Sequence, residues 1–152
     1  AVLDTSGQAL KPGVEASPYL IKPNVFEAAS LTGGNGNSIA GIVNMAKAFH
    51  QVGVSSVVIS AGKDLALFSN GARMWQAQPP IIEEMNPTGA GDAMLAGIVY
   101  GLVAGESEDR AFKWGIAAGA AAASKEGTGI PSRNEVVKLI EEVKVKEILN
   151  AI

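Results

Sequence analysis

The chain has 152 residues, with 12 Lys+Arg against 15 Asp+Glu, so its formal net charge at pH 7 is −3. This negative balance argues against a general nucleic-acid-binding protein, which needs clustered basic residues to neutralise phosphates. With no cysteine, the chain has neither disulfides nor thiolate metal sites, and we expect a reducing, cytoplasmic location. No apolar run reaches the roughly 18 residues that span a bilayer, so no membrane association is expected. The length suits one domain with a substantial core.

Strands and helices alternate along the predicted chain, which favours an α/β layered fold. In chain order, the predicted elements are strands over 1–3 and 19–22, helices over 24–31 and 38–52, strands over 56–60, 66–69, 72–76 and 81–85, a helix from Asp92 to about Ala104, and helices over 107–124 and 132–149. Asn70-Gly71 is a strong hairpin signal between two of these strands.

Apolar residues at helical spacing indicate which helix faces are buried. In the helix over 38–52, the shared apolar face comprises Ile39, Ile42, Val43, Ala46 and Phe49. After Asp92, a wide apolar stripe comprises Met94, Leu95, Ile98, Val99, Leu102 and Val103. Small residues on the same helix, among them Gly97 and Gly101, allow a neighbouring helix to approach closely.

The stretch from Met85 to Gly97 is the most informative part of the sequence. A strand-like run is followed by a turn with Gly89 and Gly91 and then by a helix. The first N–H groups of a helix have no internal partner and carry partial positive charge, so the N–H groups of Gly89, Ala90 and Gly91 can bind an anion. Asp92 can accept a proton from a hydroxyl beside that anion. The alternative is that Asp92 only complements the helix dipole and the glycines only make a turn.

Two further segments are candidates for ligand binding, each with a structural alternative. Asn24 and Glu27 can both reach a water-bound Mg²⁺ or phosphate oxygens, or they form a capping box at a helix start. The segment 60–65, Ser-Ala-Gly-Lys-Asp-Leu, follows a strand at the edge where α/β proteins bind ligands, or it is an ordinary tight turn.

Other residue types narrow the chemistry. The glycine-rich turn is neither a Walker A loop nor a dinucleotide fingerprint, because no Lys-Ser/Thr pair follows it and Met94 stands where the third glycine would be. His50 is the only histidine, so a metal cluster built on several histidines is excluded. Trp75 and Trp114 are interpreted as core or interface residues, because no basic residues interleave with them.

Together these segments resemble the ribokinase-like (PfkB) carbohydrate kinase family, in order along nearly the whole chain. The matching segments are residues 4–7, 22–27, 60–62, 86–92 and 126–128. In the same order, these segments are similar to five features of the family: the end of a central strand, the KPNxxE segment, the SxG turn of the nucleotide site, the second family signature and a late loop beside the nucleotide. The resemblance implies the C-terminal portion of a ribokinase-like α-β-α fold.

The resemblance also implies roles for the residues of the glycine-rich turn and of the KPNxxE segment. Asp92 would be the catalytic base, and Gly89, Ala90 and Gly91 would form the anion hole for the transferred γ-phosphoryl. Asn24 and Glu27 would position Mg²⁺ and phosphates, with Glu27 acting through water.

Further residues are implied to bind ATP and a cation. The ATP contacts of the turn after the third strand would come from Ser60, Gly62, Lys63, Asp64 and Leu65, although the family usually has a second glycine where this chain has Leu65. Gly119 or Ile116 would line the adenine pocket. A potassium site is implied near Asn86, Thr88, Ala122, Lys125 and Gly127, mostly through carbonyl oxygens. Asn86 replaces the acidic or Ser residue of many relatives.

The implied activity is the ATP-dependent phosphorylation of a sugar phosphate, of the 1-phosphofructokinase or tagatose-6-phosphate kinase type. Family members are about twice this length, so we expect residues 1–152 to be the nucleotide-binding half, without the N-terminal sugar-binding half and lid. The start at Ala1 without Met fits a piece of a longer domain, inactive alone and needing its missing half or a homodimer partner. The alternatives are a kinase of an unphosphorylated sugar or nucleoside, and a non-catalytic nucleotide-binding module.

Overall fold

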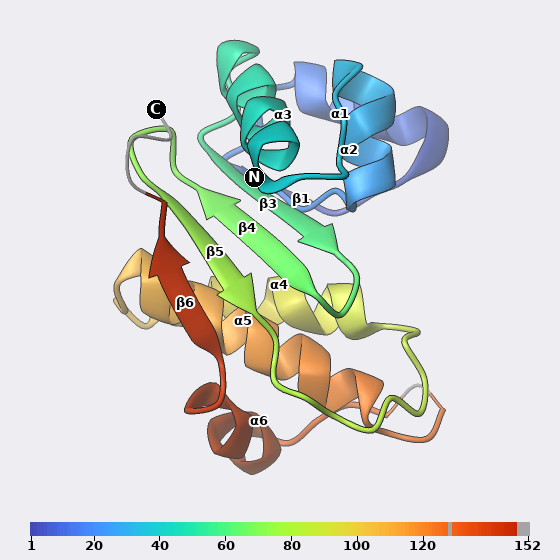
Figure 1. Ribbon diagram of the computed structural model, residues 1–152, viewed down its shortest axis with the longest axis vertical. Coiled ribbons are helices and arrows are strands. Elements are labelled where there is room, and N and C mark those ends of the chain that lie inside the picture. Colours follow the sequence, from blue (N-terminus) through green and yellow to red (C-terminus); the bar gives the residue numbers. More distant parts are fainter. Residues whose placement is uncertain (128, 149–152) are drawn as a thin grey trace. The chain divides into compact units, whose positions relative to one another are not determined.

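The computed structural model describes residues 1–127 and 129–148 (Figure 1). Its internal contacts divide the chain into two compact units, which are described separately below. Unit 1 comprises Ala1–Gln76 together with the C-terminal segment that begins at Glu147, and unit 2 comprises Ala77–Lys146. The fold class predicted from the sequence, α/β, is confirmed, because a six-stranded sheet in the order β1-β2-β3-β4-β5-β6 occurs together with helices.

The strands of unit 1 begin with three parallel ones. These are β1 (Val2–Leu3), β2 (Leu20–Ile21) and β3 (Ser56–Ala61), and they are followed by β4 (Leu65–Ser69), which is antiparallel to β3. The side chains of Val57, Val58 and Ile59 are completely buried, as expected for a strand covered on both faces. The carboxyl ends of β1, β2 and β3 therefore meet at one edge of the sheet.

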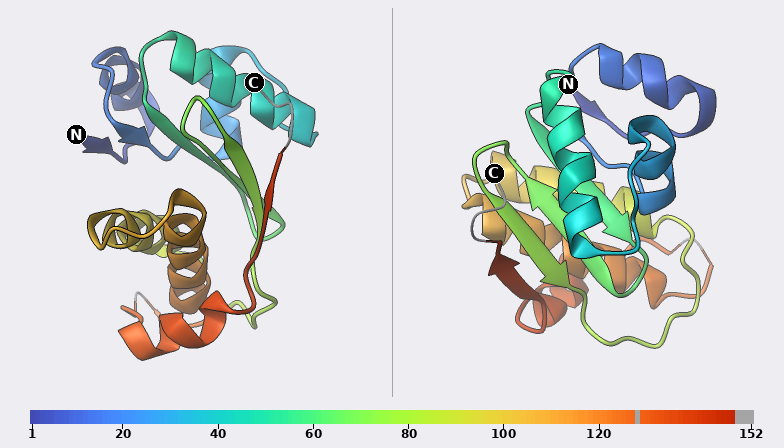
Figure 2. Two further views of the ribbon diagram at one scale, coloured as in Figure 1. Left: turned by 90° about the vertical axis from the view of Figure 1, so that its left-hand side faces the viewer. Right: turned by 45° about the horizontal axis from the view of Figure 1, so that its top comes forward.

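The helices of unit 1 are η1 (Gly7–Ala9), α1 (Leu10–Glu15), α2 (Val25–Thr32) and α3 (Ile39–Gln51). Helices α2 and α3 contact each other and both contact β3 (Figure 2). The core of the unit contains Ile42, Met45 and Phe49 from α3. The predicted buried face of α3 is confirmed except at Ile39, which is 37% exposed, because it lies in the first turn, next to the cap.

The hairpin between β4 and β5 (Met74–Gln78) has a longer turn than the sequence predicts. The Asn70 side-chain oxygen accepts hydrogen bonds from the N–H groups of Ala72, at 2.9 Å, and Arg73, at 2.6 Å. Because these bonds hold both residues in the turn, β5 begins at Met74 instead of the predicted residue 72.

Unit 2 is built on the helix pair α4 (Ala90–Val103) and α5 (Glu108–Ala123), with α6 (Arg133–Ile140) against α5. A Cβ on Gly97 would lie 2.6 Å from the carbonyl oxygen of Trp114, so only glycine permits this separation of α4 and α5. The predicted close approach is confirmed, and α5 is buried along most of its length. Val103 departs from the predicted apolar stripe, because it is 83% exposed at the end of α4.

Two predicted elements of unit 2 are wrong. Residues 81–85 form no strand; instead the N–H groups of Met85 and Asn86 both donate to the carbonyl of Ala123, at 2.9 and 3.0 Å. The last helix ends at Ile140 instead of reaching residue 149, which lies outside the described residues. Strand β6 (Lys144–Glu147) follows, because the Val-Lys-Val-Lys-Glu alternation has the two-residue period of a strand. At its end, the N–H of Ile148 donates to the carbonyl of Met74 at 2.8 Å.

Candidate functional site

The first group of candidate residues lies at the carboxyl ends of β1, β2 and β3 in unit 1. Asp4 follows β1 and Lys22 follows β2, and the Lys22 ammonium lies 3.4 Å from an Asp4 carboxylate oxygen. The Lys22 side chain is only 9% exposed, against 29% for Asp4. Sequence reasoning had not predicted this ion pair, because the two residues are brought together only by the parallel pairing of β1 and β2.

The segments around Asn24 and Ser60 are brought together as well. Asn24 and Ser60 form an isolated parallel β-bridge, and the N–H of Ser60 donates to the carbonyl of Pro23 at 3.3 Å. Two of the segments singled out in the sequence are thus neighbours at the sheet edge where ligands bind in α/β proteins.

Asn24 and Glu27 form the capping box that was one of their two interpretations. The Asn24 side-chain oxygen accepts from the N–H groups of Phe26 and Glu27, both at 2.9 Å, and Glu27 Oε2 accepts from the N–H of Asn24 at 2.8 Å. The capping box is therefore confirmed. It uses one oxygen of the Glu27 carboxylate, and no group in the described part of the chain donates to the second oxygen, which can bind a water or a cation.

The turn after β3 is exposed to solvent. Gly62, Lys63 and Asp64 are exposed, and Gly62 has a φ of +66°, which favours glycine. Leu65 begins β4 opposite Ala61, and its partly buried side chain packs against the core of unit 1. The packing gives Leu65 a structural role, and its contact with ATP stays a prediction.

The second group of candidates surrounds the start of α4 in unit 2. Gly89 precedes the helix with a φ of +82°. The N–H of Ala90 donates to the carbonyl of Pro87 at 3.1 Å, so one member of the predicted anion hole is engaged in the turn. In the part of the chain that the structure describes, the N–H groups of Gly91 and Asp92 donate to no other group. The Asp92 side chain is exposed beside them in the first turn.

Asn86 links this turn to the loop after α5. Its side-chain oxygen accepts from the N–H of Thr88 at 2.9 Å, and its amide nitrogen donates to the carbonyl of Gly127 at 3.0 Å. The carbonyl of Ala122 accepts the N–H of Lys125 at 3.1 Å. The predicted cation residues are thus tied to one another in part, by the bonds of Asn86 with Thr88 and Gly127 and of Lys125 with Ala122. Thr128, which completes the late loop, lies outside the described residues.

The two residues predicted to line an adenine pocket lie within the helix pair. Ile116 is only 1% exposed. A Cβ on Gly119 would lie 3.1 Å from the carbonyl oxygen of Ala90, so the absence of a side chain lets the first turn of α4 approach α5. Their contact with adenine stays a prediction.

The loop after α5 is also tied to α6, through Lys125, which the resemblance had placed only near the potassium site, and through Glu135. Lys125 Nζ donates to Glu135 Oε1 at 2.7 Å, and Glu135 Oε2 accepts from the N–H and the hydroxyl of Ser132, both at 2.7 Å. The pKa of Glu135 is lowered to about 2. The largest cause is the hydrogen bond from the Lys125 ammonium, followed by those from the hydroxyl and the N–H of Ser132. Ser132 and Glu135 form a capping box at the start of α6, and the lysine that pairs with Glu135 lies ten residues earlier, in the loop after α5.

Across residues 1–127 and 129–148, no three His, Cys, Asp or Glu side chains are grouped so that they could hold a metal ion. No helix in the described part of the chain combines the length and the apolar character needed to cross a membrane.

Comparison with known proteins places these features in a family. The profile of the pfkB family carbohydrate kinases matches residues 1–135. The chain is 32% identical over 145 residues to 1-phosphofructokinase of Escherichia coli (strain K12), which covers 95% of this chain and 46% of that protein. Among solved structures, phosphofructokinase-2 from Escherichia coli in complex with potassium matches with a TM-score of 0.85 at 27% identity, covering 92% of this chain and 46% of that one.

A plant enzyme extends the comparison beyond phosphofructokinases. Arabidopsis thaliana ribokinase, complexed with ribose and ATP, matches with a TM-score of 0.75 at 25% identity, covering 80% of this chain and 40% of that one. The α/β fold is therefore ribokinase-like, and the chain spans about half the length of the curated relatives it matches. On the family match and the ordered motifs, the chain belongs to the pfkB family of carbohydrate kinases.

Proposed function

We propose that this chain supplies the ATP-binding half of a sugar-phosphate kinase, of the 1-phosphofructokinase or tagatose-6-phosphate kinase type. The observation that carries the proposal is the start of α4, where an exposed carboxylate, Asp92, stands beside the N–H groups of Gly91 and Asp92 that donate to no other group in the described chain. Membership of a carbohydrate kinase family supports the same conclusion.

The proposed reaction is the transfer of the γ-phosphoryl group of ATP to a sugar hydroxyl. The Asp92 carboxylate accepts the hydroxyl proton as the hydroxyl oxygen forms its bond to phosphorus. The bond between phosphorus and the β–γ bridging oxygen breaks, and ADP leaves. The N–H groups of Gly89, Gly91 and Asp92 stabilise the charge on the phosphoryl oxygens, as backbone donors at a helix start do. The N–H of Ala90 is engaged with the carbonyl of Pro87, so Ala90 helps to form the turn that orients the other N–H groups.

The residues of unit 1 are proposed to hold the other phosphates. The ammonium of Lys22 is held at the sheet edge by Asp4, close in sequence to Asn24. Glu27 fits Mg²⁺ held through water, because its capping bond leaves one carboxylate oxygen and because Mg²⁺ commonly keeps several waters and takes only one or two carboxylates. Bound Mg²⁺ would neutralise phosphate charge. The exposed turn of Gly62, Lys63 and Asp64 is proposed to contact the nucleotide.

A monovalent cation is proposed beside the start of α4. The carbonyl oxygens of Ala122 and Gly127, with Asn86 and Thr88 near them, are the oxygen donors that such an ion prefers. Support comes from the relative phosphofructokinase-2, whose structure was solved with potassium.

The proposed substrate is a phosphorylated ketose. Its support is that relatives 32% and 33% identical to this chain are named 1-phosphofructokinase. A second candidate is an unphosphorylated sugar, which the similarity to a ribokinase solved with ribose and ATP favours. Because the proposal places the sugar-binding half outside this chain, the two candidates are distinguished by ADP release from the complete kinase with fructose 1-phosphate, fructose 6-phosphate, tagatose 6-phosphate and ribose.

Nucleotide binding is the first test, because it requires only the chain itself. Calorimetric titration of the 152-residue chain with ATP and Mg²⁺ is expected to give one site, and Asn24→Ala is expected to weaken it. Asn44→Ala, at an exposed position of α3, is the matched control and is expected to bind ATP as the unchanged chain does. Equal weakening in both variants, or no binding by the unchanged chain, would contradict the proposal.

Turnover is the second test. A chimera in which the chain replaces the matching 145-residue segment of the Escherichia coli relative is expected to release ADP in the presence of fructose 1-phosphate. The chain alone is expected to bind ATP without turnover. Full turnover by the chain alone would refute the assignment to half of a kinase, and a folded chimera that binds ATP and releases no ADP with any of the four sugars would favour a non-catalytic nucleotide-binding module.

A further inference from the structure

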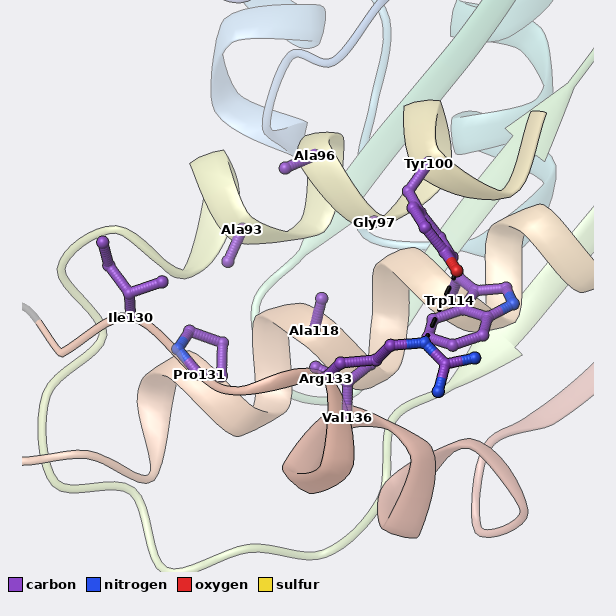
Figure 3. Close-up of a pocket in the computed structure, with 10 residues that line it drawn as sticks. All are labelled: Ala93, Ala96, Gly97, Tyr100, Trp114, Ala118, Ile130, Pro131, Arg133 and Val136. Atoms are coloured by element: carbon purple, nitrogen blue, oxygen red, sulfur yellow. Dashed lines mark hydrogen bonds between the residues drawn. The ribbon is translucent and has the colours of Figure 1, made fainter. Parts of the chain in front are cut away.

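Unit 2 contains a cavity of about 260 Å³ that includes none of the residues proposed above for phosphoryl transfer (Figure 3). Its floor consists of small residues, with Ala93, Ala96 and Gly97 from α4 and Ala118 from α5. A cavity of roughly 150 Å³ lined by apolar side chains holds a benzene molecule. The volume therefore accommodates one aromatic ring with a short substituent, and it is too small for a nucleotide.

The two ends of the cavity differ in chemistry. In Figure 3, Ile130 and Pro131 lie at one end, and Tyr100, Trp114 and Arg133 lie at the other. The first end offers only apolar surface. The second end is aromatic and cationic, so a molecule that fills the cavity meets polar side chains at one end alone.

The polar end is organised by contacts among its three side chains. The rings of Tyr100 and Trp114 pack edge to face with centroids 4.9 Å apart, and the Arg133 guanidinium carbon lies 5.6 Å from the centroid of the Trp114 ring. Arg133 Nε also donates to the Tyr100 hydroxyl at 3.5 Å. These contacts hold the guanidinium beside Tyr100 and Trp114 through its Nε, and in the described part of the chain the terminal nitrogens of this exposed side chain donate to no other group.

The charge at this end has no counter-ion within the described chain. No Asp or Glu among residues 1–127 and 129–148 forms a salt bridge with Arg133, whereas Arg73 and Arg110 pair with Glu147 and Glu106. The guanidinium and the indole N–H only donate hydrogen bonds, and the guanidinium fork matches a carboxylate. A ligand that complements the cavity is therefore an acceptor at one end and apolar at the other.

We propose that this cavity binds a small aromatic carboxylate. Its ring lies on the floor of Ala93, Gly97 and Ala118, and its carboxylate accepts from the terminal nitrogens of Arg133. A neutral ring would gain the apolar contacts and leave the guanidinium without its anion. A free inorganic anion would gain the charge and leave the apolar floor exposed to water. This site is independent of the proposed kinase activity, because neither Asp92 nor any other residue proposed for phosphoryl transfer lines the cavity.

Benzoate is the probe, and the two tryptophans give the readout. Trp114 lines the cavity, while Trp75 is buried in unit 1 beneath Arg73, so the indole N–H signal of Trp75 is an internal control. In an NMR titration of the 152-residue chain, benzoate is expected to shift only the Trp114 signal, with a Kd at least about tenfold lower than that of benzamide. Inorganic phosphate is expected to shift neither signal. Equal Kd values for benzoate and benzamide, or an unmoved Trp114 signal, would overturn the proposal.

Two variants separate charge from shape. Arg133→Gln is expected to remove the preference for benzoate over benzamide, whereas Arg110→Gln, an exposed arginine outside the cavity, keeps it. Ala96→Leu fills the cavity and is expected to weaken benzoate and benzamide alike, with Val103→Leu on the same helix as its control. If Arg133→Gln fails to fold, Ala96→Leu still decides, because unchanged benzoate binding in that variant places the ligand elsewhere and refutes the proposal.

Discussion

The proposed site residues of the two units are held in place by different interactions. In unit 1, Lys22 is held by an ion pair with Asp4, and Asn24 and Glu27 hold each other through a capping box. In unit 2, Asp92 is exposed in the first turn of α4, and its place depends on how closely α4 lies against α5.

This difference has a consequence for how substitutions act. Removal of a side-chain bond in unit 1 costs that bond and leaves the strands and helices in place. In unit 2 the backbone itself is positioned, by glycines whose missing side chains let two helices meet. We therefore expect unit 2 to be sensitive to added atoms and unit 1 to be sensitive to lost ones.

The largest expected effect on stability is at Gly97. In Gly97→Val, the new Cβ lies 2.6 Å from the carbonyl oxygen of Trp114 and 2.9 Å from Cα of Gly115, so the helices must separate. We expect a loss of about 2 to 3 kcal/mol in the free energy of unfolding, measured by urea denaturation. Ala96→Val, at an exposed position of the same helix, carries the same β-branched side chain and is expected to lose much less. Valine is a better helix former than glycine and a poorer one than alanine, so equal losses in the two variants would contradict a specific effect of close approach at Gly97.

A smaller effect is expected from the capping box of α2. Asn24→Ala removes the acceptor for the N–H groups of Phe26 and Glu27 and is expected to lower the free energy of unfolding by about 1 kcal/mol. Asn24→Asp keeps a capping oxygen and is expected to retain most of the stability. If Asn24→Asp loses as much free energy of unfolding as Asn24→Ala, the capping hydrogen bonds do not account for the stabilisation at position 24.

The smallest effect is expected from pH, through Glu135. Its pKa is lowered to about 2 from 4.5, chiefly by Lys125, so the folded state favours the ionised carboxylate. The stabilisation is complete above pH 4.5 and is lost as the pH falls towards about 2. The difference in Tm between the unchanged chain and Glu135→Gln is therefore expected to shrink over this range. A difference that stays constant down to the lowest pH would contradict the assigned pair.

Interactions between residues close in sequence were predicted well, and those between distant residues were not. The capping box at Asn24 was one of two interpretations of its segment, because Asn24 and Glu27 lie only three residues apart. The ion pair of Lys22 with Asp4 and the cavity beside Arg133 were missed, because each joins segments that only the fold brings together.

The errors in secondary structure have similar causes. The final helix was extended through the segment that forms β6, whose alternating side chains favour a strand once β5 is beside it. Helix α1 was missed because it contains Pro12 and Gly13, which are poor helix formers, although proline is tolerated in a first turn. Helix α4 begins at Ala90, two residues before the predicted start at Asp92, so Gly91 lies in its first turn, and the engagement of the Ala90 N–H with Pro87 depends on turn geometry.

The proton-accepting role of Asp92 can be tested with a single substitution. In the chimera with the Escherichia coli relative, Asp92→Asn removes the base and keeps the size of the side chain. We expect ADP release to fall by roughly 10² to 10⁴-fold while the Kd for ATP stays nearly unchanged. Asp109→Asn, in the first turn of α5, is the matched control and is expected to keep full turnover. Turnover in Asp92→Asn equal to that in Asp109→Asn would contradict the account.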